Sequence, residues 1–159
     1  ARRDGSFDFL LISGDEKHGY DEFIATVDAL VMGRNSFETA LSFGSWPYDK
    51  PVFVLSSRSL PPIPPGAVVE HLSGEPTDIV ANLSGRGIKH IYVDGGITIQ
   101  RFLEAGLIDR LIITTVPVLI GTGIPLFGPV ARDISLSHVA TRQFPSGFVQ
   151  SEYSVVTRR

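Results

Sequence analysis

The order in which strand-like and helix-like segments follow one another is the feature that most restricts the fold of this chain. Short apolar runs such as residues 29–32 are bounded by turn residues, which is typical of strands buried on both faces of a parallel sheet. Segments with apolar residues at helical spacing, such as 35–41, lie between these runs. Two consecutive strand-like runs, 135–144 and 148–157, close the chain around a turn at 145–147. This pattern predicts an α/β fold with a mostly parallel sheet and an antiparallel C-terminal hairpin.

The same two spacings predict the other elements. With 159 residues and no linker or repeat, the chain is expected to form one domain over 1–159. An Asp4-Gly5 turn opens it, and the Pro-rich segment 59–66 is expected to be an extended loop. Strands are predicted at 29–32, 51–55, 67–70, 89–93 and 109–118, and helices at 20–28, 35–41, 75–83 and 97–105.

Composition excludes several classes of protein. The formal net charge is −3, so no broad basic surface is available for nucleic acid or for a membrane anchor. The chain has no cysteine, which rules out disulfides, thiolate zinc sites and cysteine nucleophiles. The four histidines are scattered and give no metal-ligand cluster, so no metal is expected. No apolar run approaches the length of about 20 residues that spans a bilayer, and the default expectation is a cytoplasmic protein.

The first candidate binding segment follows the strand at 29–32. Gly33 allows the backbone to turn and to approach a ligand closely. The following helix N-terminus offers free N–H groups to a phosphate, and Arg34, Asn35 and Ser36 add charge and polar groups. The alternative is that Ser36 is simply the N-cap and Arg34 a surface residue.

The second candidate segment is Leu55-Ser56-Ser57-Arg58, where a buried strand ends in two hydroxyls and a guanidinium. An arginine near a ribose is how a fold accommodates the 2′-phosphate of NADP. The alternative is an ordinary polar exit from a strand.

The third candidate segment is Asp94-Gly95-Gly96-Ile97-Thr98, between a strand and a helix. Two adjacent glycines lose much backbone entropy on folding, so their presence here indicates that the backbone requires them. Close approach of a ligand is one reason, and a tight turn is the other. Asp94 could orient a ligand or cap the helix. No Gly-x-Gly-x-x-Gly or Walker A motif is present, which excludes an ordinary Rossmann domain and a P-loop protein.

These three segments, in this order, resemble the dihydrofolate reductase superfamily. Met32-Gly33-Arg34-Asn35-Ser36 resembles its Met-Gly-Arg-x-Thr/Ser signature, and Leu55-Ser56-Ser57-Arg58 resembles its Leu-Ser-Ser segment. Val93-Asp94-Gly95-Gly96 resembles its Gly-Gly turn, where the family often has a cis peptide. Segments 4–9, 43–48, 106–111 and 117–127 look more like the branch related to the C-terminal reductase domain of the riboflavin-biosynthesis enzyme RibD.

The resemblance implies a three-layer fold with helices on both faces of the sheet, and it implies NADPH as cofactor. By position, residues 33–36 would contact phosphates, residues 55–58 would hold the adenosine and the 2′-phosphate, and residues 95–98 would hold the pyrophosphate and nicotinamide side. The mechanism implied is direct hydride transfer, and no catalytic residue is assigned. The family's opening strand would lie ahead of Ala1. The position of the acid that binds a pterin falls near Gly19, which Asp15, Glu16, Asp21 and Glu22 flank.

Three functions are therefore expected as alternatives. The first is an NADPH-dependent reductase, as in dihydrofolate reductase, for a pterin-like or pyrimidinone-like heterocycle. The second is the riboflavin-pathway reduction of 5-amino-6-(5-phosphoribosylamino)uracil, with Lys17, His18 and Arg101 as candidates for the substrate phosphate. The third is a non-catalytic NADPH-binding module. A homodimer is expected by resemblance, and the hairpin in 135–157 could supply the sheet edge that a partner covers.

Overall fold

The computed structural model describes residues 1–157, which divide into two compact units. One unit spans Asp21–Leu107, and the other joins Ala1–Tyr20 to the chain from Ile108 onward. That residues 1–159 form a single domain stays a prediction. None of the helices in residues 1–157 combines the length and the apolar character that crossing a bilayer requires.

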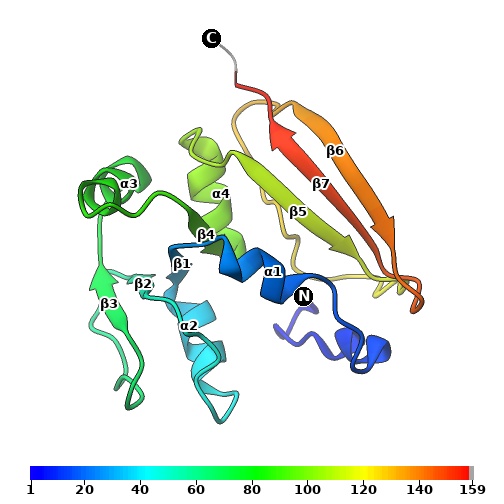
Figure 1. Cartoon of the computed structure of the whole chain (residues 1–159), viewed down its shortest axis with the longest axis horizontal. Helices are drawn as coiled ribbons and strands as arrows, with labels where there is room; N and C mark the ends of the chain where they lie inside the picture. The colour runs from blue at the N-terminus through cyan, green and yellow to red at the C-terminus, as the bar shows by residue number, and fades with distance from the viewer. Residues whose placement is uncertain (158–159) are drawn as a thin grey trace. The chain divides into compact units, whose positions relative to one another are not determined.

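A four-stranded parallel sheet organises the unit Asp21–Leu107, in the order β3-β2-β1-β4 (Figure 1). Since β2 and β3 lie on one side of β1 and β4 on the other, the strand order reverses between β1 and β4. In open parallel sheets, ligands bind outside the carboxyl ends of strands near such a reversal. The strands are β1 (Ala29–Gly33), β2 (Val52–Leu55), β3 (Val69–Leu72) and β4 (Ile91–Asp94), and the helices are α1 (Tyr20–Ala25), α2 (Arg34–Leu41), α3 (Pro76–Gly85) and α4 (Gly96–Glu104).

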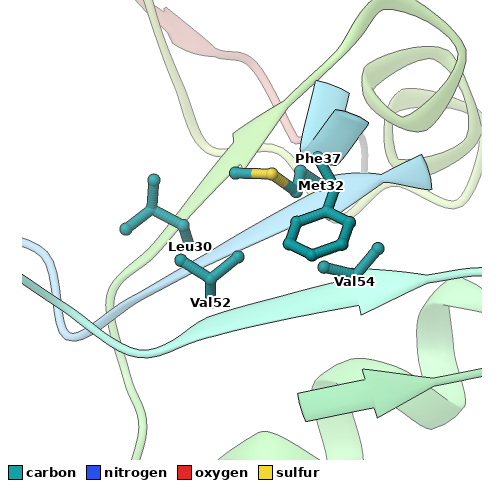
Figure 2. Packing of buried hydrophobic residues seen from close by; sticks show 5 residues of the cluster. All are labelled: Leu30, Met32, Phe37, Val52 and Val54. Carbon is teal, nitrogen blue, oxygen red and sulfur yellow. The ribbon is translucent and has the colours of Figure 1, made fainter. Parts of the chain in front are cut away.

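The core of this unit lies between β1, β2 and α2. All residues of β2 and the first four of β1 are buried, as the continuous apolar runs predict for central parallel strands. Figure 2 shows the Phe37 ring of α2 reaching toward the side chains of Met32 and Val54. This packing fixes α2 against the sheet, and with it the turn between β1 and α2.

A three-stranded antiparallel sheet organises the other unit, in the order β5-β7-β6 (Figure 1). It consists of β5 (Arg110–Thr115), β6 (Leu136–Gln143) and β7 (Val149–Val155). The predicted α/β class and C-terminal hairpin are confirmed. The sequence pattern predicted one sheet, whereas the described residues form two. β5 pairs along six residues with β7, so the antiparallel strands form a sheet of their own.

The helix predicted over 20–28 is shorter in the structure and ends at Ala25. Asp28 lies beyond this helix, and its carboxylate accepts the backbone N–H groups of Lys89 at 2.9 Å and His90 at 3.0 Å. The side chain thereby ties the segment before β1 to the segment before β4. A 3₁₀ helix, η1 (Asp8–Ser13), forms where the sequence pattern predicted no element.

Candidate functional site

The turn between β1 and α2 presents backbone N–H groups without a side-chain cap. Gly33 is the N-cap residue, in extended conformation, and α2 begins at Arg34. Ser36 therefore lies in the first turn of the helix, and the alternative that it caps the helix is wrong. Helix N-termini carry unpaired N–H groups and a partial positive charge, which suits an anion.

Arg34 is held in place by two neighbours. Its Nε donates to Glu38 Oε1 at 3.0 Å, one helical turn further along α2, and its Nη1 donates to the carbonyl of Ser59. The guanidinium is thus positioned over the loop that follows β2. A positioned guanidinium loses less side-chain entropy when it binds a phosphate.

The segment after β2 is anchored by its backbone and leaves its polar side chains accessible. The Ser56 carbonyl oxygen lies 2.6 Å from His71 Nε2, and the Ser56 hydroxyl accepts the backbone N–H of Arg58 at 3.1 Å. Ser57 and Arg58 are exposed, and within residues 1–157 no side chain or backbone group pairs with the Arg58 guanidinium. This cation is available to a ligand.

The turn between β4 and α4 packs directly against the turn between β1 and α2. A Cβ atom on Gly95, which has φ +97°, would lie 2.6 Å from Ser36 Oγ. A Cβ atom on Gly33 would lie 2.9 Å from Thr98 Oγ1. The close approach that these glycines permit is between the two turns of the protein itself. The Gly95–Gly96 peptide is trans, unlike the peptide that the resemblance implies.

Asp94 ends β4 beside these turns. Gly95 is the N-cap residue of α4 with no side-chain cap, so Asp94 does not cap the helix. Burial raises the pKa of the Asp94 carboxyl, and the hydrogen bond from the Gly95 N–H offsets this in part.

A polar cavity of about 450 Å³ lies at the carboxyl ends of β1, β2 and β3. Its size falls within the range of roughly 300–1,000 Å³ that is usual for small-molecule sites. It brings together six of the predicted residues: Arg34, Asn35, Leu55, Ser56, Ser57 and Arg58. The other seven, which do not line it, are Gly33, Ser36, Asp94, Gly95, Gly96, Ile97 and Thr98.

Four further residues complete the cavity wall: Ser73, Gly74 and Glu75 after β3, and Arg101 from α4. The rule that ligands bind at strand ends could have found the first three, but the sequence pattern placed that strand two residues too early. Arg101 was a candidate for a substrate phosphate. The structure places it in the same cavity as Arg34 and Arg58, whereas Lys17 and His18 belong to the other unit.

The cavity's charge suits an anion. Three arginines and one glutamate line it, together with three serines. Guanidinium groups bind phosphate oxygens in pairs of hydrogen bonds, and serine hydroxyls donate further ones. A nucleotide that carries several phosphates fits this chemistry, which is also what the predicted segments implied. Among residues 1–157, no three acidic or histidine side chains are grouped so that they could hold a metal ion.

Three of the four carboxylates near Gly19 lie in contacts or positions that the structure defines. Asp21 and Glu22 are exposed in the first turn of α1, where their negative charges interact favourably with the helix dipole. Glu16 accepts the Ser146 backbone N–H at 3.1 Å and the Ser146 hydroxyl, and it lies 3.0 Å from His18 Nε2. The bonds from Ser146 lower the pKa of Glu16. These contacts tie residues 16–18 to the turn between β6 and β7.

Comparison with known proteins gives one consistent result. A family profile described as the RibD C-terminal domain matches residues 9–150. The uncharacterized protein YwjB of Bacillus subtilis (strain 168) is 31% identical over 151 residues, which cover 91% of this chain and 84% of YwjB. A crystal structure from Shewanella sp. PV-4, of a protein that its name assigns provisionally to riboflavin biosynthesis, is 36% identical with a TM-score of 0.90, and the match covers 99% of this chain and 92% of that one.

Dihydrofolate reductase from Enterococcus faecalis, solved with NADP(H), is 19% identical with a TM-score of 0.54, over 85% of this chain and 79% of that one. That likeness shows a shared fold. The predicted resemblance to a RibD-like branch of the dihydrofolate reductase superfamily is therefore confirmed. The chain belongs to the RibD C-terminal domain family.

Proposed function

We propose that this chain is an NADPH-dependent reductase that transfers hydride to a small pterin-like or pyrimidinone-like heterocycle. The observation that carries the proposal is the cavity at the ends of β1, β2 and β3, where Arg34, Arg58 and Arg101 meet beside an uncapped helix N-terminus. Membership of a family of reductases supports the reaction class. NADPH, when bound, supplies the hydride.

The chain's own residues bind and orient the cofactor in this proposal. Arg34, fixed by Glu38 and Ser59, and the N–H groups of α2 hold the phosphates nearest the first helix. Ser56, Ser57 and Arg58 hold the adenosine end. The cofactor supplies the reacting hydride, so the main contribution of the protein is to align the nicotinamide donor with the heterocyclic acceptor.

The riboflavin-pathway substrate is the second candidate, because the matching family takes its description from RibD. That substrate carries a phosphate of its own. Since Arg101 lines the cavity proposed for the cofactor, Lys17 and His18 remain as candidates for the substrate phosphate. The His18 ring stacks on the Phe148 ring with 4.6 Å between the ring centroids, and its Nε2 lies 3.0 Å from Glu16 Oε2. In this proposal Nδ1 is the His18 nitrogen that would donate to the substrate phosphate.

A turnover assay distinguishes the candidates. The loss of NADPH absorbance is followed with dihydrofolate and with 5-amino-6-(5-phosphoribosylamino)uracil as separate acceptors. Oxidation with either acceptor supports the reductase and names its substrate class. NADPH binding without turnover of either acceptor would contradict the reductase and favour the non-catalytic module. The double variant Arg34→Ala/Arg58→Ala is expected to lose NADPH binding, and wild-type binding by this variant would refute the assignment of the cavity.

We also propose that the protein acts as a homodimer. β6 is one of the two edge strands of the three-stranded sheet, and all its residues are exposed, including Leu136 and Val139. An open strand edge is stabilised when a partner covers it. Sedimentation equilibrium is expected to give twice the chain mass, and a monomer at micromolar concentration would contradict the proposal.

A further inference from the structure

One wall of the cavity carries a pair of opposite charges that no predicted motif includes. Arg101 Nη2 lies 3.9 Å from Glu75 Oε2 and donates to the carbonyl of Gly74 at 3.3 Å. Glu75 is the one acidic residue among the described residues that line the cavity. It is also the N-cap residue of α3, yet its side chain makes no capping hydrogen bond. Its carboxylate therefore makes no hydrogen bond to the first turn of this helix.

An acid and an arginine have opposite effects on the choice of dinucleotide. A carboxylate at the adenosine ribose accepts hydrogen bonds from the free hydroxyls of NADH, and it repels the 2′-phosphate of NADPH. An arginine at the same place attracts that phosphate. This cavity contains both groups, so its preference depends on which of them faces the ribose.

The structure holds the two side chains with different firmness. The Glu75 side chain is 78% exposed and the Arg101 side chain 44% exposed. Arg101 is the better fixed of the two, since it is also bonded to the Gly74 carbonyl. Arg34 and Arg58 are the other two cations that line the cavity.

We propose that Arg101 determines the preference for NADPH, by pairing with Glu75 and by offering the 2′-phosphate a second guanidinium in addition to that of Arg58. This inference rests on the proposed function, in which the cavity binds the dinucleotide. Without Arg101, the Glu75 carboxylate is unpaired and the cavity favours NADH. Arg101 is a specificity residue in this account and takes no part in hydride transfer.

The test is calorimetric titration of the full chain with NADPH and with NADH. Arg101→Ala is expected to weaken NADPH binding roughly tenfold to a hundredfold, the range for a charge-assisted hydrogen bond, and to leave NADH binding equal or tighter. Glu75→Gln is expected to tighten NADPH binding about two- to fivefold, as for a partly exposed ion pair. In the double variant, Glu75→Gln restores part of the NADPH affinity that Arg101→Ala removes.

A matched control separates this effect from the loss of any arginine. The Arg86 side chain is also 44% exposed and pairs with Glu70, and it does not line the cavity. Arg86→Ala is expected to leave both affinities unchanged, and thermal unfolding checks that every variant is folded.

Two outcomes would overturn the inference, and they differ. If the wild-type chain binds NADPH and Arg101→Ala keeps the same ratio of NADPH to NADH affinity, the role of Arg101 fails while the proposed function stands. If the wild-type chain binds neither dinucleotide, the proposed function fails and the inference fails with it.

Discussion

Replacing Gly95 by alanine tests whether the two turns at the site are packed as closely as the structure shows. Gly95 has φ +97° and ψ +131°, a region that only glycine adopts without strain. The backbone strain costs about 1–3 kcal/mol. The new Cβ atom would meet Ser36 Oγ at 2.6 Å, and turning Ser36 off its rotamer adds roughly 0.5–1.5 kcal/mol. We expect Gly95→Ala to lower the free energy of unfolding by about 2–4 kcal/mol.

Two other glycines of the same unit separate these contributions in urea unfolding. Gly87 has φ +83° with open space around its Cβ position, so Gly87→Ala measures the cost of a positive φ without a steric clash. Gly85 has ordinary backbone geometry and open space, so Gly85→Ala is expected to be neutral or slightly stabilising. Ser36→Ala in the Gly95→Ala background should recover only the part due to the contact. A Gly95→Ala variant as stable as the wild type would refute the packing of the two turns.

Three further predictions concern the core and the two shifted carboxyl groups. Phe37→Ala removes a fully buried ring and is expected to lower the free energy of unfolding by about 3–5 kcal/mol. Phe43→Ala, at a ring 52% exposed, should lower it far less. Equal effects of the two variants in thermal unfolding would contradict the placement of Phe37 in the core. The pKa of Glu16 is lowered in the folded state, so the wild type should lose stability as pH falls below about 4.5. Glu16→Gln should reduce this loss when the urea midpoint is plotted against pH. If the variant loses stability in acid as steeply as the wild type, the hydrogen bonds from Ser146 are contradicted. The pKa of Asp94 is raised, so its ionisation should reduce stability as pH rises above 3.8. Asp94→Asn should therefore be at least as stable as the wild type at neutral pH. A markedly less stable variant at that pH would show that the ionised carboxylate stabilises the fold.

The strands of the parallel sheet could be predicted because each is buried on both faces. β1 and β2 read as continuous apolar runs, and their carboxyl ends were placed within one residue. The predicted segments at those ends, residues 34–35 and 55–58, are the ones that the structure brings into one cavity. Parallel strands bring their ends to one edge, so correct strand ends are enough to group these residues.

β3 was harder to place, and the error concealed part of the site. Only its first and last residues are partly buried, while Glu70 and His71 are exposed, so no continuous apolar run marks it. The pattern placed its end at Glu70 rather than Leu72. With the end at Leu72, residues 73–75 follow directly and would have been candidates by the rule used elsewhere.

The place of Arg101 could not be predicted from local sequence. The residue follows β4 in the chain but bonds to the Gly74 carbonyl after β3. That contact depends on the strand order and on α4 packing against β1 as well as β4. The start of α2 had a similar limitation, because Gly33 and Ser36 are both acceptable N-cap residues and only the observed backbone shows which one serves.

The most direct test of the account is a calorimetric titration of the wild-type chain with NADPH, followed by the same titration with NADH. We expect NADPH binding at micromolar affinity or tighter and NADH binding at least tenfold weaker, because Arg58 and Arg101 favour the extra phosphate. Equal affinity for the two would contradict the assignment of these arginines to that phosphate. The absence of heat with either dinucleotide, in a chain that unfolds cooperatively, would contradict the proposal that the cavity holds the cofactor of a reductase.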